Sequence, residues 1–326
     1  MNESIDDEYL EESYSPELDE LIPKTRDEAV ERLKQGRLFR LLDSIVKFLL
    51  ARPESEEICR DFLNSVIFPE GHREISSVEL LDTNLPPARL RGRGSRIDAY
   101  CTVDDGSKIN VEIQLNYDAA HASRAVYYWS LVHTNQLESG DIFQDVDRTV
   151  SVNILGFDML KLEKNFCNSY SIRNDGSSRV LTDDLKIIFI ELPKFIRELK
   201  KPGRKLKNKL ERWLCFFVGL EDEIMPDIAD AEPVISLALK QEQIFLMDER
   251  MRMAYIDDLM DMYSERKRGA RAQKLARDRY ELAEENRKHA QRERKAAIKF
   301  IELGMSIEEI ALTMGLPESD VRDYIA

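Results

Sequence analysis

The sequence predicts an α/β fold with a mixed sheet, followed by a C-terminal helical extension. Two observations carry this prediction. Short runs with strand periodicity recur between residues 75 and 192, whereas longer segments with helical spacing lie before, between and after them. A helix expected over 118–138 separates two of the strands, and a crossover of that length makes the second strand parallel to the first. An Asp-Gly turn also joins the first of these strands to its predecessor as an antiparallel hairpin, so both kinds of pairing are expected.

The individual elements follow from the same periodicities. Helices are expected over 28–68, 118–138 and 206–260, and strands over 75–82, 95–103, 107–115, 149–157 and 185–192. The expected core residues on the second and third helical segments are Tyr127, Tyr128, Trp129, Val132, Trp213, Phe216 and Phe217. Residues 1–24 are expected to form an acidic disordered tail, because residues 1–21 hold nine Asp or Glu and no Lys or Arg.

Three segments make up the rest of the predicted organisation: a folded domain over 25–255, a charged helix over 256–296 and a helix-turn-helix-like unit over 297–326. From Asp261 to Lys295 the chain holds 12 Lys or Arg against 7 Asp or Glu, a net charge of +5, which is typical of an exposed helix. The last unit contains a capping box and a helix-ending glycine, namely Ser306, Glu309 and Gly315. Its acidic second helix argues against strong DNA binding by this unit alone, so packing or self-association is the alternative role.

The predicted hairpin, formed by 96–103 and 107–115, is the most informative segment. A two-residue loop would set Asp98 opposite Ile113 and turn the apolar row of one strand toward the polar face of the other. A three-residue loop sets Asp98 opposite Glu112 and brings both apolar rows to one face, so pattern consistency favours it. The two rows are Ile97, Ala99, Cys101 and Val103, and Ile109, Val111 and Ile113.

This register brings two carboxylates together. Directly opposed residues have Cβ atoms about 4.5–5.5 Å apart, and two carboxylates that close repel each other when both are ionised. A divalent cation removes the repulsion, and all-oxygen ligation suits Mg²⁺ or Mn²⁺. The backbone carbonyl of Ile113 is a further candidate ligand, and Gln114 lies one step along the same face. Such an ion polarises a phosphoryl group and activates water, which phosphodiester hydrolysis requires. The alternative interpretation of Asp98 and Glu112 is an ordinary polar strand face.

Composition excludes several other classes of function. The chain has 326 residues and a net charge of −14, with no long apolar run and an acidic rather than basic-then-apolar start, so a cytoplasmic protein without membrane insertion is expected. Neither a zinc-ligand spacing of histidines nor a glycine-rich phosphate loop is present in the sequence. The cysteines have no paired spacing and are expected to be buried thiols: Cys59, Cys101, Cys167 and Cys215.

A wider set of motifs resembles a known family. In chain order the motifs are Phe62-Leu63-Asn64, Val78 to Pro86, Arg96-Ile97-Asp98, Asn110 to Gln114, Arg124 to Tyr128, Val152 to Leu155, and Ile190 to Lys194. Their order and spacing, over residues 35–326, resemble the recombination-promoting nuclease and transposase family of the PD-(D/E)XK nuclease superfamily. The resemblance implies a restriction-endonuclease-like mixed sheet flanked by helices, and divalent-metal-dependent cleavage of DNA.

The resemblance also implies roles for single residues. Asp98 would be the first metal ligand, Glu112 the second acid, and Gln114 stands where the wider superfamily has lysine. A glutamine orients water by hydrogen bonds but carries no charge, and it is common in the resembled family. The superfamily also uses an acid on the first core helix, and Asp43 lies in the matching segment, where a solvated helix face or cap is the alternative. Lys47, one turn later, is either a substitute charge donor or a surface lysine.

An arginine-rich segment precedes the hairpin. Its arginines surround two glycines, and they are Arg89, Arg91, Arg93 and Arg96. Their position beside the expected metal site suits a clamp for DNA phosphates, and an exposed loop with incidental arginines is the alternative.

Together these features predict a metal-dependent endodeoxyribonuclease that acts in DNA recombination or transposition. Asp98 and Glu112 would hold Mg²⁺ or Mn²⁺, Gln114 would position water, and Asp43 would be an auxiliary ligand. DNA is the expected partner, and the C-terminal helices offer a surface for a homo-oligomer. Two alternatives stay open: a catalytically inactive DNA-binding or self-associating scaffold, and a nuclease that cleaves RNA.

Overall fold

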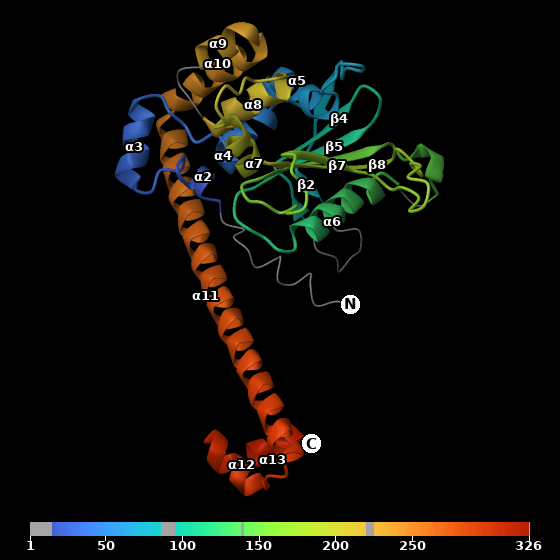
Figure 1. Cartoon of the computed structure of the whole chain (residues 1–326). Coiled ribbons are helices and arrows are strands. Elements are labelled where there is room, and N and C mark those ends of the chain that lie inside the picture. Colours follow the sequence, from blue (N-terminus) through green and yellow to red (C-terminus); the bar gives the residue numbers. More distant parts are fainter. Residues whose placement is uncertain (1–14, 86–94, 138–139, 220–224, 326) are drawn as a thin grey trace. The chain divides into compact units, whose positions relative to one another are not determined.

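The computed structural model describes residues 15–85, 95–137, 140–219 and 225–325 (Figure 1). They form two units, one ending at Lys267 and the other beginning at Arg268. Helix α11 (Glu249–Glu302) contributes residues to both units. No helix in these described ranges combines the length and the apolar character needed to cross a membrane.

A six-stranded mixed sheet lies at the centre of the first unit, in the order β1-β4-β5-β6-β8-β7. Its strands are β1 (Val78–Leu80), β4 (Ala99–Val103), β5 (Lys108–Gln114), β6 (Thr149–Leu155), β7 (Cys167–Tyr170) and β8 (Leu185–Glu191). Strands β5, β6 and β8 run parallel to one another, and the remaining pairs in this sheet are antiparallel. Helix α6 (His121–Thr134) connects β5 to β6 as the predicted crossover. The predicted mixed sheet is therefore confirmed.

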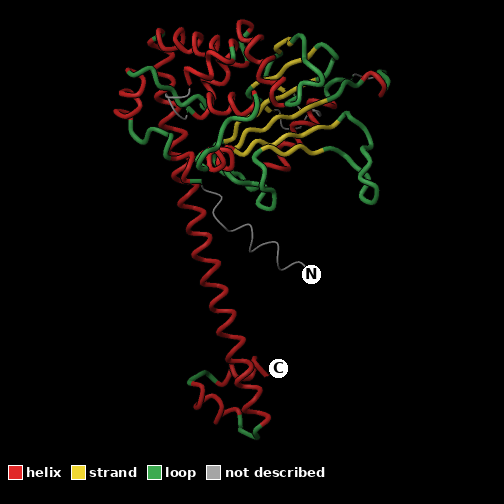
Figure 2. The backbone as a smooth tube through the Cα atoms, turned by 45° about the horizontal axis from the view of Figure 1, so that its top comes forward, coloured by secondary structure: helices red, strands yellow, loops and turns green. Residues whose placement is uncertain are grey.

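Helices cover both faces of this sheet (Figure 2). The elements outside the sheet in the first unit are α2 (Pro16–Asp19), α3 (Arg26–Lys34), α4 (Asp43–Leu50), α5 (Glu56–Ile67), α7 (Leu192–Leu199), α8 (Lys209–Val218), α9 (Met225–Ala231), α10 (Pro233–Met247), the 3₁₀ turns Pro53–Ser55 and Phe143–Asp145, and a separate ladder of β2 (Asn84–Leu85) with β3 (Ser95–Arg96). Helix α6 packs on one face of the sheet, and α4, α5 and α8 build the core on the other.

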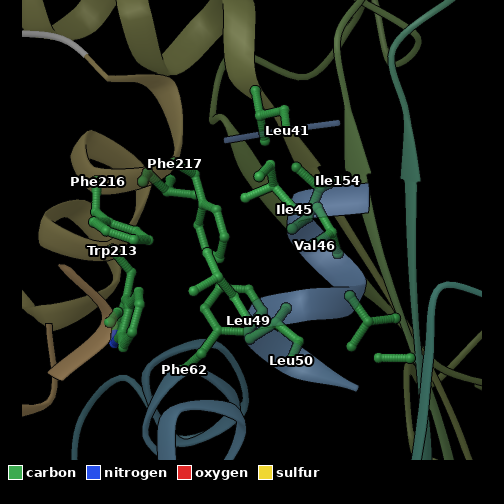
Figure 3. Close-up of a cluster of buried hydrophobic side chains, with 14 of the residues drawn as sticks. Leu41, Ile45, Val46, Leu49, Leu50, Phe62, Ile154, Trp213, Phe216 and Phe217 are labelled. Carbon is green, nitrogen blue, oxygen red and sulfur yellow. The ribbon is translucent and has the colours of Figure 1, made fainter. Parts of the chain in front are cut away.

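The strands alternate between these two cores. On β6, Val152 and Ile154 face the larger core, whereas Leu155 faces the α6 side. Figure 3 shows Ile154 near the aliphatic side chains of α4, with Phe62 of α5 and three aromatic side chains of α8 close by. The α8 aromatics are the predicted core residues Trp213, Phe216 and Phe217, and all three are fully buried. Every residue of β6 is buried, as expected for a central parallel strand.

Several predicted elements differ from the structure. The helices expected over 28–68 are α3, α4 and α5, and a non-helical connection separates the first two, because α3 ends before Gly36, which has a φ of +74°, and α4 begins only at Asp43. Strand β7 and helix α7 were not predicted. Tyr127 was expected in the core but is 38% exposed, because it lies on the outer face of α6. Of the cysteines expected to be buried, only Cys167 is partly exposed.

The expected disordered tail is wrong for its last ten residues. Leu18 and Ile22 are fully buried in the larger core. Acidic side chains on either side of Leu18 form ion pairs, Glu17 with Arg197 and Asp19 with Arg266. Burial of two large aliphatic side chains contributes about 1.5–3 kcal/mol each, which offsets part of the cost of ordering this acidic stretch.

The second unit has a small core of its own. Helices α12 (Ile307–Met314) and α13 (Glu318–Ile325) follow the end of α11, and they bury Ala297, Ile310 and Val321. The predicted capping box of Ser306 and Glu309 is present, and Gly315 adopts a φ of +68°.

Candidate active site

The site begins with the hairpin of β4 and β5. Ala99 pairs with Val111, and the Val103 N–H donates to the Ser107 carbonyl at 3.1 Å. Gly106 closes the loop with a φ of +85°. This arrangement confirms the three-residue loop, and the paired register ends at Ala99, the residue that follows Asp98.

Asp98 lies on a bend immediately before β4 rather than within the strand. The bend interrupts the alternation of faces, so the prediction that Ile97 shares the core row of Ala99 is wrong. Ile97 instead packs with Tyr100 and residues of α6 on the opposite side of the sheet. The Oδ2 atom of Asp98 accepts a hydrogen bond of 2.7 Å from the Ile113 N–H, which ties its carboxylate to β5.

The surroundings of Asp98 disfavour its ionised form. Burial is the largest influence and raises the pKa of Asp98 to about 7. The Ile113 N–H opposes this effect, the neighbouring Asp43 carboxyl raises the pKa further, and the Lys47 charge lowers it. Asp98 and Asp43 are therefore close enough to interact, as the sequence suggested.

Glu112 is buried on β5, and its Oε1 atom has no hydrogen-bond partner among the described residues. Burial and the negative charge of Asp98 raise the pKa of Glu112 to about 9, and the positive charges of Arg124 and Lys47 oppose the rise. An unpartnered buried carboxylate oxygen is costly, so this side chain favours either a proton or a bound cation.

Asp43 and Lys47 enter the site from the first turn and a half of α4. The Lys47 ammonium lies 2.6 Å from Oδ2 of Asp43. Lys47 is therefore not an isolated surface lysine, and its charge reaches both Asp98 and Glu112. Asp43 is mostly exposed, at 58% of its side chain, so it stands at the entrance of the site rather than inside it.

Gln114 makes two side-chain hydrogen bonds. Its Nε2 atom donates to the Asn116 carbonyl at 2.8 Å, and its Oε1 atom accepts from Nη2 of Arg124 at 2.5 Å. The other arm of the Arg124 guanidinium lies 3.1 Å from Oδ2 of Asp118. Sequence reasoning gave Arg124 no role, although its position near the start of the crossover helix was a usable signal.

A cavity of about 290 Å³ opens beside these side chains. One wall carries Asp43, Asp98 and Gln114, and the opposite wall comes from α11. The acidic residues of that second wall are Asp258, Asp261 and Glu265. No sequence signal pointed to them, because they lie about 150 residues after the hairpin, and two of them belong to the segment of net positive charge that begins at Asp261.

Helix α11 is attached to the end of the sheet next to this cavity. The buried guanidinium of Arg266 donates to the Leu115 carbonyl after β5 and, at 3.3 Å, to the Gly156 carbonyl after β6. Gly156 has no room for a side chain, since a Cβ atom there would lie 2.8 Å from the Leu115 carbonyl oxygen. The ends of β5 and β6 and the acidic wall are thereby held together.

The arginine-rich segment contributes no described side chain to the site. Arg89, Arg91 and Arg93 lie outside the described residues. The backbone of Arg96 pairs with Asn84 in the small β2–β3 ladder. Their role as a phosphate clamp remains a prediction.

The donor set is compatible with a hard divalent cation. Within the described ranges, no three Asp, Glu, His or Cys side chains gather closely enough to hold a metal by themselves. Mg²⁺ is commonly bound by only one or two carboxylates, with water completing its coordination. The unpartnered Glu112 oxygen and the mutual repulsion of Asp98 and Glu112 meet that requirement.

Comparison with protein families identifies the family of this chain. Residues 40–272 match the family model of the PD-(D/E)XK nuclease family transposases, which spans the whole sheet and the first part of α11. Searches of curated proteins and of solved structures found no significant match. The matched range contains every residue that lines the cavity. Because the match covers more than half of the sequence, the chain belongs to the PD-(D/E)XK nuclease family transposases.

Proposed function

We propose that this protein is a divalent-metal-dependent DNA endonuclease that hydrolyses phosphodiester bonds during recombination or transposition. One observation carries the proposal: the Asp98 carboxylate is bonded to the Ile113 N–H, next to Glu112 on β5, and a buried oxygen of Glu112 is left without a partner. Membership of a nuclease family supports the reaction class.

The ion would be Mg²⁺ or Mn²⁺, held by Asp98 and Glu112. Asp43 and the Ile113 carbonyl are auxiliary candidates. When bound, such an ion activates water and polarises a phosphodiester. The Ile113 N–H holds the Asp98 carboxylate in place, and Gln114 would orient the attacking water with its remaining amide N–H. Lys47 and Arg124 supply positive charge from the two flanking helices.

DNA is the proposed partner, although the cavity itself is acidic. Without a cation, five carboxylates on its walls would repel a phosphate: Asp43, Asp98, Asp258, Asp261 and Glu265. The protein therefore requires a cation before a phosphodiester can approach. The arginines over residues 89–96 are the proposed contacts to phosphates outside the cavity.

Cleavage of supercoiled plasmid in Mg²⁺ or Mn²⁺ tests the proposal. Wild type should nick the plasmid and lose this activity in EDTA, and Asp98→Ala and Glu112→Ala should each abolish it. Glu79→Ala is the matched control, because Glu79 is an exposed acid on β1 of the same sheet. Equal cleavage by wild type and both site variants would reject the assignment, and thermal unfolding would show that the variants are folded.

One observation favours the alternative of a catalytically inactive scaffold. Gln114 carries no charge, and one of the two lone pairs of its oxygen is engaged by Arg124. If the protein is such a scaffold, the wild type should bind DNA in an electrophoretic mobility-shift assay but should show no metal-dependent nicking. Competition between DNA and RNA substrates would separate the third candidate, an RNA nuclease.

A further inference from the structure

Arg124 contacts the site directly, although it belongs to neither strand of the hairpin. Its Nη2 atom is 2.5 Å from Oε1 of Gln114, and its Nη1 atom is 3.1 Å from Oδ2 of Asp118. Its Nε atom is buried and has no hydrogen-bond partner among the described residues. The guanidinium is therefore fixed at both ends and directed at the side chain that lies next to Glu112 on the same face of β5.

We propose that Arg124 is a positioning residue that holds the Gln114 amide in one orientation and places a fixed positive charge beside Glu112. This inference rests on the proposed nuclease function for its catalytic consequence. The orientation itself is independent of that function.

The hydrogen-bond chemistry allows only one orientation of the amide. A guanidinium has donors and no acceptor, so it must face the oxygen of Gln114. The Asn116 carbonyl has no donor, so it must face the nitrogen of Gln114. One amide N–H of Gln114 and one lone pair of its oxygen are left over. The free N–H can donate to a water or a phosphate oxygen, whereas the rotated amide would present its oxygen there instead.

The positive charge of Arg124 complements this arrangement. Glu112 and Gln114 are two residues apart on one strand, so their side chains project from the same face. A cation bonded to Gln114 therefore lies close to Glu112, consistent with its opposing influence on that carboxyl. An uncharged glutamine thus acquires, through Arg124, both an orientation and a neighbouring charge.

Lys47 is the other positively charged residue near these carboxylates, and the contacts of Lys47 differ from those of Arg124. Lys47 reaches the carboxylates from α4 and is engaged by Asp43 at 2.6 Å. Arg124 approaches from α6 on the other face of the sheet and bonds to Gln114 itself. Removal of Lys47 should therefore leave the orientation of Gln114 unchanged.

The test combines plasmid cleavage with a measurement that needs no cleavage. In Mg²⁺, Arg124→Gln should lower the single-turnover rate about 10²-fold, the magnitude typical of one lost preorganised donor. Adding Gln114→Lys to Arg124→Gln should restore the rate to within about tenfold of wild type, because a lysine supplies charge without help. Arg212→Gln is the matched control, since Arg212 is similarly buried and also ion-paired, but on α8. Its rate should equal that of wild type.

The second measurement is the side-chain amide signal of Gln114 in protein labelled with ¹⁵N-glutamine, assigned by its loss in Gln114→Leu. Arg124→Gln should shift this signal and speed its hydrogen exchange at least about tenfold, whereas Lys47→Gln should not. An unchanged amide signal in Arg124→Gln would overturn the positioning role. Equal cleavage by wild type and Arg124→Gln, or a double variant no faster than Arg124→Gln, would overturn the catalytic consequence. A wild type that never cleaves, but whose amide responds as expected, would refute the nuclease function and leave the positioning role standing.

Discussion

The raised pKa values of Asp98 and Glu112 predict that the metal-free protein loses stability as the pH rises. In the folded state both carboxyls hold a proton at a pH where the unfolded chain has released it. The folded state therefore binds more protons, and the free energy of unfolding falls with increasing pH. The contribution of these two carboxyls to stability is fully present below about pH 4, the ordinary pKa range of Asp and Glu. It is lost as the pH rises through the folded-state pKa values, about 7 for Asp98 and about 9 for Glu112.

The size of the effect follows from Asp98. Its pKa rises from 3.8 to about 7, and each pKa unit corresponds to about 1.4 kcal/mol, so the full effect is about 4 kcal/mol. The exposed surface of Asp98 shows that this residue is only partly buried, so water screens part of the interaction. The free energy of unfolding is therefore expected to fall by about 2–4 kcal/mol. Asp98→Asn removes the titrating group and its repulsion of Glu112. This variant should be more stable than wild type at about pH 9 by a similar amount.

Urea unfolding in EDTA, at several values between about pH 5 and about pH 9, measures this difference. Both tryptophans, Trp129 and Trp213, belong to the first unit, so their fluorescence reports on the unit that contains the site. Mg²⁺ at 100 times its dissociation constant should restore about 2.7 kcal/mol to wild type and much less to Asp98→Asn. Parallel stability curves for the two proteins across this pH range would refute the reasoning.

Three other substitutions test separate features. Gly106→Ala should cost about 1–2 kcal/mol in urea unfolding, because Gly106 has a φ of +85°, and a wild-type midpoint would contradict the loop geometry. Glu242→Gln should cost about 3–5 kcal/mol, because it leaves the guanidinium of Arg40 buried without its anion. The double change Arg40→Met with Glu242→Leu should cost clearly less, and an equal loss would show that the charge is not the cause. Ser306→Ala should weaken α12 by about 1 kcal/mol, read from amide hydrogen exchange, and unchanged exchange would argue against the capping box as a source of stability.

The hairpin register could be predicted because one loop length alone keeps both apolar rows on one face. The same argument failed at Ile97, because the bend at Asp98 turns the Ile97 side chain to the opposite face of the sheet from Ala99. Hydrophobic periodicity carries no information about such a bend. The capping box and Gly315 were predictable because both are local hydrogen-bond patterns.

Tertiary contacts of the site were beyond the reach of local patterns. The Gln114–Arg124 hydrogen bond depends on how the crossover helix returns across the sheet. The acidic wall depends on α11 meeting the ends of β5 and β6, far away in sequence. Burial of Leu18 and Ile22 was missed because the acidic composition around them outweighed two apolar residues. Catalytic roles for Asp98, Glu112 and Gln114 stay predictions until cleavage is measured.

The attachment of α11 by Arg266 has a consequence for cooperativity. Its guanidinium satisfies the main-chain oxygens of Leu115 and Gly156 and pairs with Asp19, so detaching α11 would leave both carbonyl oxygens and the Asp19 carboxylate without this partner. Such an opening costs several interactions at once rather than one. The amide protons at the ends of β5 and β6 and those of α11 near Arg266 should therefore exchange with solvent in a single event with one free energy. The strand ends and the part of α11 that line the cavity would then unfold together as one foldon, although about 150 residues separate these two segments in the sequence.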